Sequence, residues 1–189
     1  MLRRPRFTPL SQFLDGDRAR GGRQSPGLQI LSRAGFPLVI VTNQPGLSNG
    51  RFTRAEFVLL QKALVDRLRD EAGIELAGFY VCPHGPGNGG TPACLCRKPA
   101  PGLLRQAAMA NRFDLSRSWM VGDILDEVEA GRRAGCRTVL LDVGNETEWR
   151  LSPLRTPHYR RPTLIEAARA ITGESALSRV SPPGSTVSA

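Results

Sequence analysis

The feature that most constrains this chain is a short loop holding three of its four cysteines. Cys82, His84, Cys94 and Cys96 lie within the run CPHGPGNGGTPACLC. Three thiolates and an imidazole form the ligand set of a tetrahedral zinc site, and a closed site of this kind is structural because no coordination position stays open for water. The Gly- and Pro-rich residues between the ligands cannot build a core. The loop therefore predicts a bound Zn²⁺, with chance clustering or the oxidised thiols of a secreted protein as alternatives.

Length, composition and charge limit the classes of function. The 189 residues suffice for one domain with a hydrophobic core. No apolar run reaches the length of a membrane span, and the basic start lacks the apolar segment of a signal peptide. Clustered thiols favour a reducing cytoplasm. The net charge of +9 suits a phosphorylated metabolite or a nucleic acid. Because the arginines are scattered without interleaved aromatic residues, we expect a phosphorylated small molecule as the ligand and not a nucleic acid. We also expect a monomer that does not bind a membrane.

Hydrophobic patterning predicts alternating strands and helices. A continuous apolar run of strand length occurs at residues 37–42, and residues 76–82, 118–123 and 137–144 are further predicted strands. Helical patterns occur at residues 28–36, 53–73, 101–113, 126–135 and 163–171. Runs without polar alternation indicate strands buried on both faces. The order of the elements predicts an α/β fold with a parallel sheet, right-handed crossovers and helices on both faces.

Polar residues follow these strands where an open α/β sheet binds its ligands. The runs are Thr42-Asn43-Gln44, Arg97-Lys98-Pro99 after the cysteine loop, and Gly122-Asp123 with Asp126, Glu127 and Glu129 beyond it. A hydroxyl and a lysine can bind phosphate oxygens, and carboxylates bind Mg²⁺. Each run alone is common as a turn, a helix cap or a solvated surface. Their order along one chain is much more specific and predicts a phosphate and magnesium site.

Four segments together resemble the haloacid dehalogenase superfamily of phosphatases: VIVTNQPGL, RFTRAEF, CPH…CLCRKPAPG and MVGDILDEVEAGRRAGC. Within it they are similar to the D-glycero-D-manno-heptose 1,7-bisphosphate 7-phosphatase and histidinol-phosphatase group. The resemblance implies a Rossmann-like domain over residues 25–172 without a large cap. It also implies magnesium-dependent hydrolysis of a sugar phosphate monoester through an aspartyl-phosphate. We expect residues 1–24 to be irregular and residues 173–189 to be a disordered tail.

The resemblance also implies roles for individual residues. Thr42 matches the hydroxyl that binds the transferring phosphoryl group, and Lys98 matches the lysine that stabilises the charge of nucleophile and phosphate. Asn43 and Arg97 are expected to contact the substrate phosphate. Asp123 matches a magnesium ligand. Glu127 stands where the family has a second acid, four residues after the first, and is expected to reach the metal.

The family's first motif, a strand ending in D-x-D-x-T/V, supplies the nucleophile and the general acid. Its only candidate here is FLDGDRA, with Asp15 as nucleophile and Asp17 as acid. The preceding TPLSQ makes a poor core strand, and Ala19 stands where Thr or Val is expected. These features favour a missing motif in a chain that starts late, which would lose the central strand and be catalytically impaired. The alternative to an active phosphatase is a non-catalytic, zinc-stabilised phosphate-binding or scaffold domain.

Overall fold

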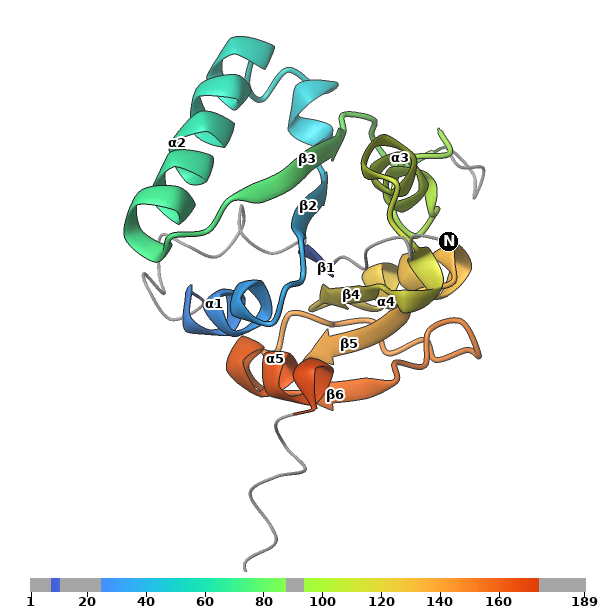
Figure 1. Ribbon diagram of the computed structural model, residues 1–189. Helices are drawn as coiled ribbons and strands as arrows, with labels where there is room; N and C mark the ends of the chain where they lie inside the picture. The colour runs from blue at the N-terminus through green and yellow to red at the C-terminus, as the bar shows by residue number, and fades with distance from the viewer. Residues whose placement is uncertain (1–7, 11–24, 88–93, 174–189) are drawn as a thin grey trace, which may run out of the picture.

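The computed structural model describes residues 8–10, 25–87 and 94–173, which form a parallel six-stranded sheet between two layers of helices (Figure 1). The strands are β1 (Thr8–Leu10), β2 (Leu38–Asn43), β3 (Leu76–Cys82), β4 (Trp119–Gly122), β5 (Arg137–Leu141) and β6 (Tyr159–Arg161), in the order β3-β2-β1-β4-β5-β6. The helices are α1 (Ser25–Arg33), α2 (Arg54–Ala72), α3 (Gly102–Asn111), α4 (Leu125–Ala134) and α5 (Leu164–Thr172). The predicted α/β class with a parallel sheet is thus confirmed.

The centre of the sheet is occupied by β1, which corrects one expectation. Leu10 pairs with Ile40 of β2 on one side and with Val121 of β4 on the other. The sequence disfavours a strand here, because TPLSQ is not apolar, yet Thr8–Leu10 form the central strand. The rest of the segment expected to be irregular, and the tail from residue 174, lie outside the described residues.

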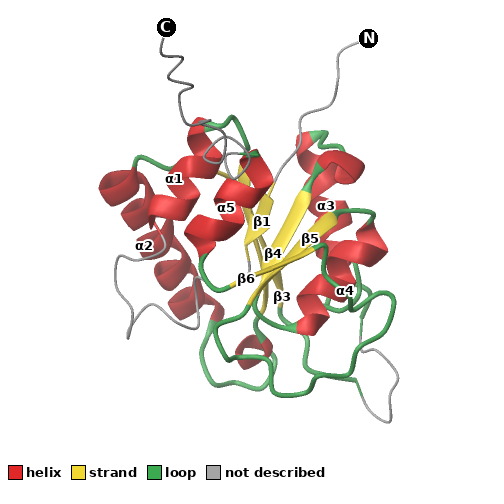
Figure 2. Cartoon of the chain, turned by 90° about the horizontal axis from the view of Figure 1, so that it is seen from below, coloured by secondary structure: helices red, strands yellow, loops and turns green. Residues whose placement is uncertain are grey.

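Two helical layers cover the sheet because alternate strand residues point to opposite faces (Figure 2). Leu38 and Ile40 of β2 belong to the core cluster that includes residues of α1, α2 and α5. Val39 and Val41 belong to the cluster on the other face, with residues of α3 and α4. Burial on both faces explains the apolar runs without alternation.

Helix ends follow the local signals of the sequence. Thr53 caps α2 with a reciprocal capping box: its hydroxyl accepts from the backbone N–H of Glu56, and the Glu56 carboxylate accepts from the backbone N–H of Thr53. Gly73 ends the helix in the left-handed conformation, with φ of 64°. Within the part of the chain that the structure describes, no helix is both long and apolar enough to span a membrane.

Because neighbouring strands of the sheet are parallel, their carboxyl ends and the loops that follow them lie at one edge of the sheet, and that edge carries the candidate site.

Candidate active site

A buried ion pair between Lys98 and Glu127 forms the centre of the candidate site. The side chains are 4% and 5% exposed, and 2.7 Å separates Lys98 Nζ from Glu127 Oε1. Lys98 Nζ also donates to the carbonyl oxygen of Val41, at 3.1 Å. Only two of the 26 basic residues are lysines, and the other, Lys62, has a 71% exposed side chain on α2. In a chain whose basic residues are otherwise almost all arginines, the buried partner of Glu127 is thus a compact ammonium and not a guanidinium.

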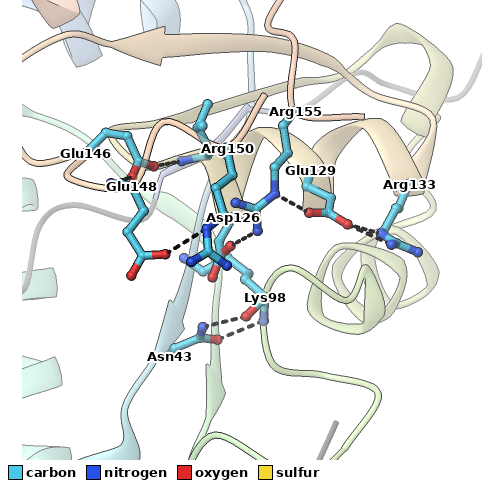
Figure 3. Close-up of polar contacts among 10 residues, drawn as sticks. Asn43, Lys98, Asp126, Glu129, Arg133, Glu146, Glu148, Arg150 and Arg155 are labelled. Carbon is cyan, nitrogen blue, oxygen red and sulfur yellow. Dashed lines mark hydrogen bonds and ion pairs between the residues drawn. The ribbon is translucent and has the colours of Figure 1, made fainter. Parts of the chain in front are cut away.

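The backbone of Lys98 is held by the side-chain amide of Asn43 (Figure 3). Asn43 Nδ2 donates to the carbonyl oxygen of Lys98 at 3.2 Å, and Asn43 Oδ1 accepts from the backbone N–H of Lys98 at 3.1 Å. The sequence predicts that Asn43 contacts the substrate phosphate. In the structure both ends of its amide instead bind the residue that follows Arg97, so Asn43 fixes the loop that carries Lys98.

Thr42 lies at the carboxyl end of β2, where Lys98 contacts the neighbouring Val41. Its side chain is 2% exposed, and its hydroxyl oxygen accepts a hydrogen bond from Gln44 Nε2 at 3.0 Å. The accepted bond leaves the hydroxyl proton available to a ligand, since a hydroxyl can donate and accept at once. Thr42 and Lys98 are therefore brought to the same end of the sheet, as predicted.

Glu127 uses both carboxylate oxygens within the protein. Oε1 binds Lys98, and Oε2 accepts from the backbone N–H of Asp123 at 2.8 Å. A Cβ at Gly122 would lie 2.0 Å from Glu127 Oε2, so only glycine leaves room for this carboxylate. The geometry places Glu127 as the counter-ion of Lys98, whereas the sequence predicts a magnesium ligand.

Asp123 follows β4 and presents a carboxylate without a cationic partner among the described residues. Its Oδ2 accepts from Asn145 Nδ2. Burial, and then the negative charge of Glu127, raises the pKa of Asp123 to about 6. A half-buried carboxylate beside a second acid is poorly solvated, and a divalent cation would relieve that cost. The donor chemistry of Asp123 therefore fits Mg²⁺.

The other acids of α4 are paired with arginines. Arg155 contacts Asp126 Oδ1 at 2.5 Å and Glu129 Oε2 at 2.7 Å, and Arg133 contacts the second oxygen of Glu129 at 2.6 Å (Figure 3). Among the described acids from Asp123 to Glu129, these pairings and that of Glu127 with Lys98 leave Asp123 without an ion pair and open to a metal.

The predicted zinc ligands gather into one cluster. The ligand atoms of Cys82, His84, Cys94 and Cys96 all lie within 4.8 Å of one another. The sulfur atoms are 3.2, 3.3 and 3.6 Å apart, and His84 Nδ1 lies 3.4 Å from Cys96 Sγ. Tetrahedral Zn–S and Zn–N bonds place such atoms roughly 3.6–3.8 Å apart. The donor set and its size therefore suit Zn²⁺.

The ionisation of the thiols also favours a cation. Burial raises the pKa of Cys82 to about 12. Against the effect of burial, hydrogen bonds from Cys96 and from the backbone N–H of Arg97 lower the pKa of Cys94 to about 7. Three adjacent thiols cannot all ionise without compensation, and a bound dication supplies it. The N–H of Arg97 also links this cluster directly to the residue before Lys98.

Of the remaining predicted residues, Arg97 contacts the cysteine loop, and Asp15 and Asp17 cannot be placed because they lie outside the described residues. Arg97 Nη1 donates to the carbonyl oxygen of His84 at 3.0 Å, so this guanidinium contacts the cysteine loop. Asp15 and Asp17 lie outside the described residues, and in the sequence Asp15 comes five positions after the end of β1.

Sequence reasoning did not identify Asn145 as part of the site. Asn145 follows β5 by a few residues, so its position at the carboxyl edge of a parallel sheet was the available signal. Asn145 and Asp123 are 22 positions apart in the sequence, so a local sequence pattern could not predict their contact.

Comparison with known proteins defines the family. A model of HAD-hydrolase-like proteins matches residues 95–167. The D-glycero-beta-D-manno-heptose-1,7-bisphosphate 7-phosphatase of Escherichia coli K12 is 36% identical over 139 residues, covering 67% of this chain and 72% of that protein. The chain belongs to the haloacid dehalogenase-like hydrolase family. The resemblance carried by the sequence motifs is thereby confirmed.

Two further proteins show which group within the haloacid dehalogenase-like family this chain is similar to. The protein of the same name from Helicobacter pylori J99 is 38% identical over 124 residues, covering 66% of this chain and 65% of that protein. The chain thus matches slightly less than two thirds of that relative's length. The crystal structure of D,D-heptose 1.7-bisphosphate phosphatase from B. bronchiseptica, complexed with magnesium and phosphate, has a TM-score of 0.67 at 25% identity, covering 90% of this chain and 99% of that one.

Proposed function

We propose that this protein is a magnesium-dependent phosphatase that hydrolyses a phosphate monoester of a sugar phosphate, of the heptose bisphosphate type. The observation that carries the proposal is the buried ammonium of Lys98 at the end of β2 that holds Thr42, with Asp123 at the end of β4, on the other side of the central strand β1. This group offers a positive charge, a hydroxyl and a metal-binding carboxylate to one phosphoryl group. The names of the relatives support the substrate class.

The described residues would divide the work on the phosphoryl group. The Thr42 hydroxyl donates to a phosphoryl oxygen, and Lys98 stabilises the charge that develops there. Asp123 would hold Mg²⁺, which when bound polarises the phosphoryl group as a Lewis acid. Glu127 keeps Lys98 in place, in a role that replaces the expected one of metal ligand. Asn43 supports the same lysine from its backbone side.

Asp15 and Asp17 are our candidates for nucleophile and general acid. They are the only carboxylates ahead of Thr42 in the sequence, and they follow the central strand β1. Asp15 would attack phosphorus, the sugar oxygen would leave with a proton from Asp17, and water would then hydrolyse the aspartyl-phosphate. The central position of β1 supports this assignment over a missing first motif.

The cysteine loop would hold one structural Zn²⁺ through Cys82, His84, Cys94 and Cys96. Its purpose would be to fix the segment that delivers Lys98, because the N–H of Arg97 donates to Cys94 Sγ. Since the ligands must remain thiolates, we propose that the protein works in a reducing compartment, the cytoplasm. We further propose that it acts as a monomer on its small phosphorylated substrate.

Phosphate release from a heptose 1,7-bisphosphate tests the proposal. We expect turnover that requires Mg²⁺, with a loss of roughly 100-fold or more in Asp123→Asn, from which the metal carboxylate is missing. Asp70→Asn, at an exposed position of α2, is the matched control and should retain activity. Loss of turnover in Asp15→Asn would establish the nucleophile. Phosphate binding without turnover in the wild-type chain would instead support the scaffold alternative.

A further inference from the structure

The loop between β5 and β6, residues 142–158, lies against the start of α4. Asn145 Nδ2 donates to Asp123 Oδ2, and the next residue, Glu146, accepts from the backbone N–H of Leu125 at 2.6 Å. The N-cap residue Ile124 offers no side-chain hydrogen bond. A carboxylate from a distant loop therefore caps α4, where the partial positive charge of the helix favours an anion. This capping contact holds Asn145 beside Asp123.

The other end of the loop is anchored by Arg155. Its side chain is 22% exposed, and its guanidinium bridges Asp126 and Glu129, both on α4 (Figure 3). A planar guanidinium suits this double contact because its donors have a fixed geometry, which the single ammonium of a lysine cannot reproduce. The loop is thus fixed to α4 at Glu146 and again at Arg155.

We propose that Asn145 is a positioning residue for the metal site at Asp123, and that the Arg155 bridge keeps Asn145 in place. The inference rests on the proposed function, since it takes Asp123 as the magnesium ligand. By binding Oδ2, Asn145 fixes the rotation of the carboxylate and leaves Oδ1 for the cation. Partners of this kind orient metal ligands, and their loss commonly weakens metal affinity by about 10–100-fold.

Arg155 also has an electrostatic part in this arrangement. By pairing with Asp126 and Glu129 it removes two carboxylates that would otherwise compete for a cation next to Asp123. Asp123 has no ion pair among the described residues, and it is the carboxylate that Asn145 orients, while Glu146 accepts from the backbone N–H groups of Leu125 and Glu148. Position and charge therefore direct a divalent cation to the same carboxylate.

The test is a Mn²⁺ titration of the zinc-loaded full chain, with free Mn²⁺ followed by electron paramagnetic resonance. Mn²⁺ takes the oxygen ligands that Mg²⁺ takes. We expect Asn145→Ala to weaken Mn²⁺ binding about tenfold, and Asn145→Gln, which keeps the donor, to recover part of the loss. Thr147→Ala, at an exposed position of the same loop, is the matched control and should bind as the wild type does. Without added Mn²⁺, the zinc-loaded Asn145→Ala variant and the zinc-loaded control should have the same melting temperature.

Arg155→Lys tests the anchor, because it keeps the charge but not the double contact. We expect it to weaken Mn²⁺ binding in the wild-type background and to have no further effect when combined with Asn145→Ala. Additive losses would refute the action of Arg155 through Asn145. Equal Mn²⁺ affinity in the wild type and Asn145→Ala would overturn the inference but leave the phosphatase proposal standing. A wild-type chain without Mn²⁺ binding would overturn both.

Discussion

The ion pair between Lys98 and Glu127 allows the sharpest prediction, through the substitution Lys98→Met. Methionine fills nearly the same space as the lysine stem, so the change removes the charge and leaves little cavity. Glu127, with a 5% exposed side chain, then keeps only the backbone N–H of Asp123 as a hydrogen-bond donor. The carbonyl oxygen of Val41 also loses the donor that lay 3.1 Å away.

The magnitude follows from burial on both sides of the pair. Removing one partner of a buried ion pair costs about 3–5 kcal/mol, because the remaining charge is uncompensated. The double variant Lys98→Met/Glu127→Gln carries no such charge. It still leaves the Val41 carbonyl without this donor, a cost of about 1–3 kcal/mol. We therefore expect the double variant to be more stable than the single one, although it differs from the wild type at one more position.

Urea unfolding at pH 7, followed by circular dichroism, measures these differences from midpoints and slopes. Lys62→Met is the matched control, since Lys62 is exposed and paired only with Asp66 on the surface of α2; its effect should stay within about 0.5 kcal/mol. Equal losses in the single and double variants would refute the reasoning, because the penalty would then not come from the unpaired carboxylate. A loss in Lys98→Met no larger than in the control would do the same.

Two further predictions concern the metals. The purified chain should contain about one zinc, and a chelator should lower its melting temperature while leaving that of Cys94→Ser unchanged, because metal binding in such loops contributes to folding; an equal shift in both proteins would contradict the assignment. Binding of Mg²⁺ should weaken as the pH falls below about 6, since the raised pKa of Asp123 lets a proton compete with the metal there, and should be independent of pH above about 7. Calorimetric or competition titrations across this range measure the effect, and Asp123→Asn should abolish it.

The sheet was predictable from the sequence except for its central and last strands. The strands β2, β4 and β5 are apolar runs buried along most of their length, and β3 is an apolar run at the sheet edge with mostly intermediate burial; such runs are the strongest local signal. β1 is three residues long and contains Pro9, a residue that argues against a central strand. It is paired on both sides by β2 and β4, so the position comes from its neighbours and not from local propensity. The short edge strand β6 was also missed, because its three residues, Tyr-Arg-Arg, form no apolar run and it is placed by its pairing with β5.

The candidate site was predictable in its principal residues and not in their partners. The spacing of the cysteine loop predicted a cluster that the structure assembles, and the motifs around Thr42, Lys98 and Asp123 predicted their common edge of the sheet. The partners of Asn43 and Glu127 were assigned differently, because each depends on contacts across 29 to 55 positions of the chain. Such contacts are set by the tertiary fold.

Two loops complete the candidate site, the segment around Lys98 and the loop that carries Asn145, and they are held in place by different contacts. The segment around Lys98 contacts the cysteine cluster through Cys94 and is held by the Asn43 amide of β2, so under the zinc proposal its order would depend on both. The loop that carries Asn145 is fixed by ionic and capping contacts to α4, none of which involves a cysteine. In the proposed site, the position of the Lys98 ammonium would thus depend on the zinc loop, and the orientation of the Asp123 carboxylate would depend on the Arg155 bridge. The two sides meet at Glu127, whose carboxylate binds both Lys98 Nζ and the backbone N–H of Asp123, so a Glu127 variant would disturb both. Cys94→Ser and Asn145→Ala, in contrast, each remove one support, so the contributions of phosphate binding and metal binding can be told apart.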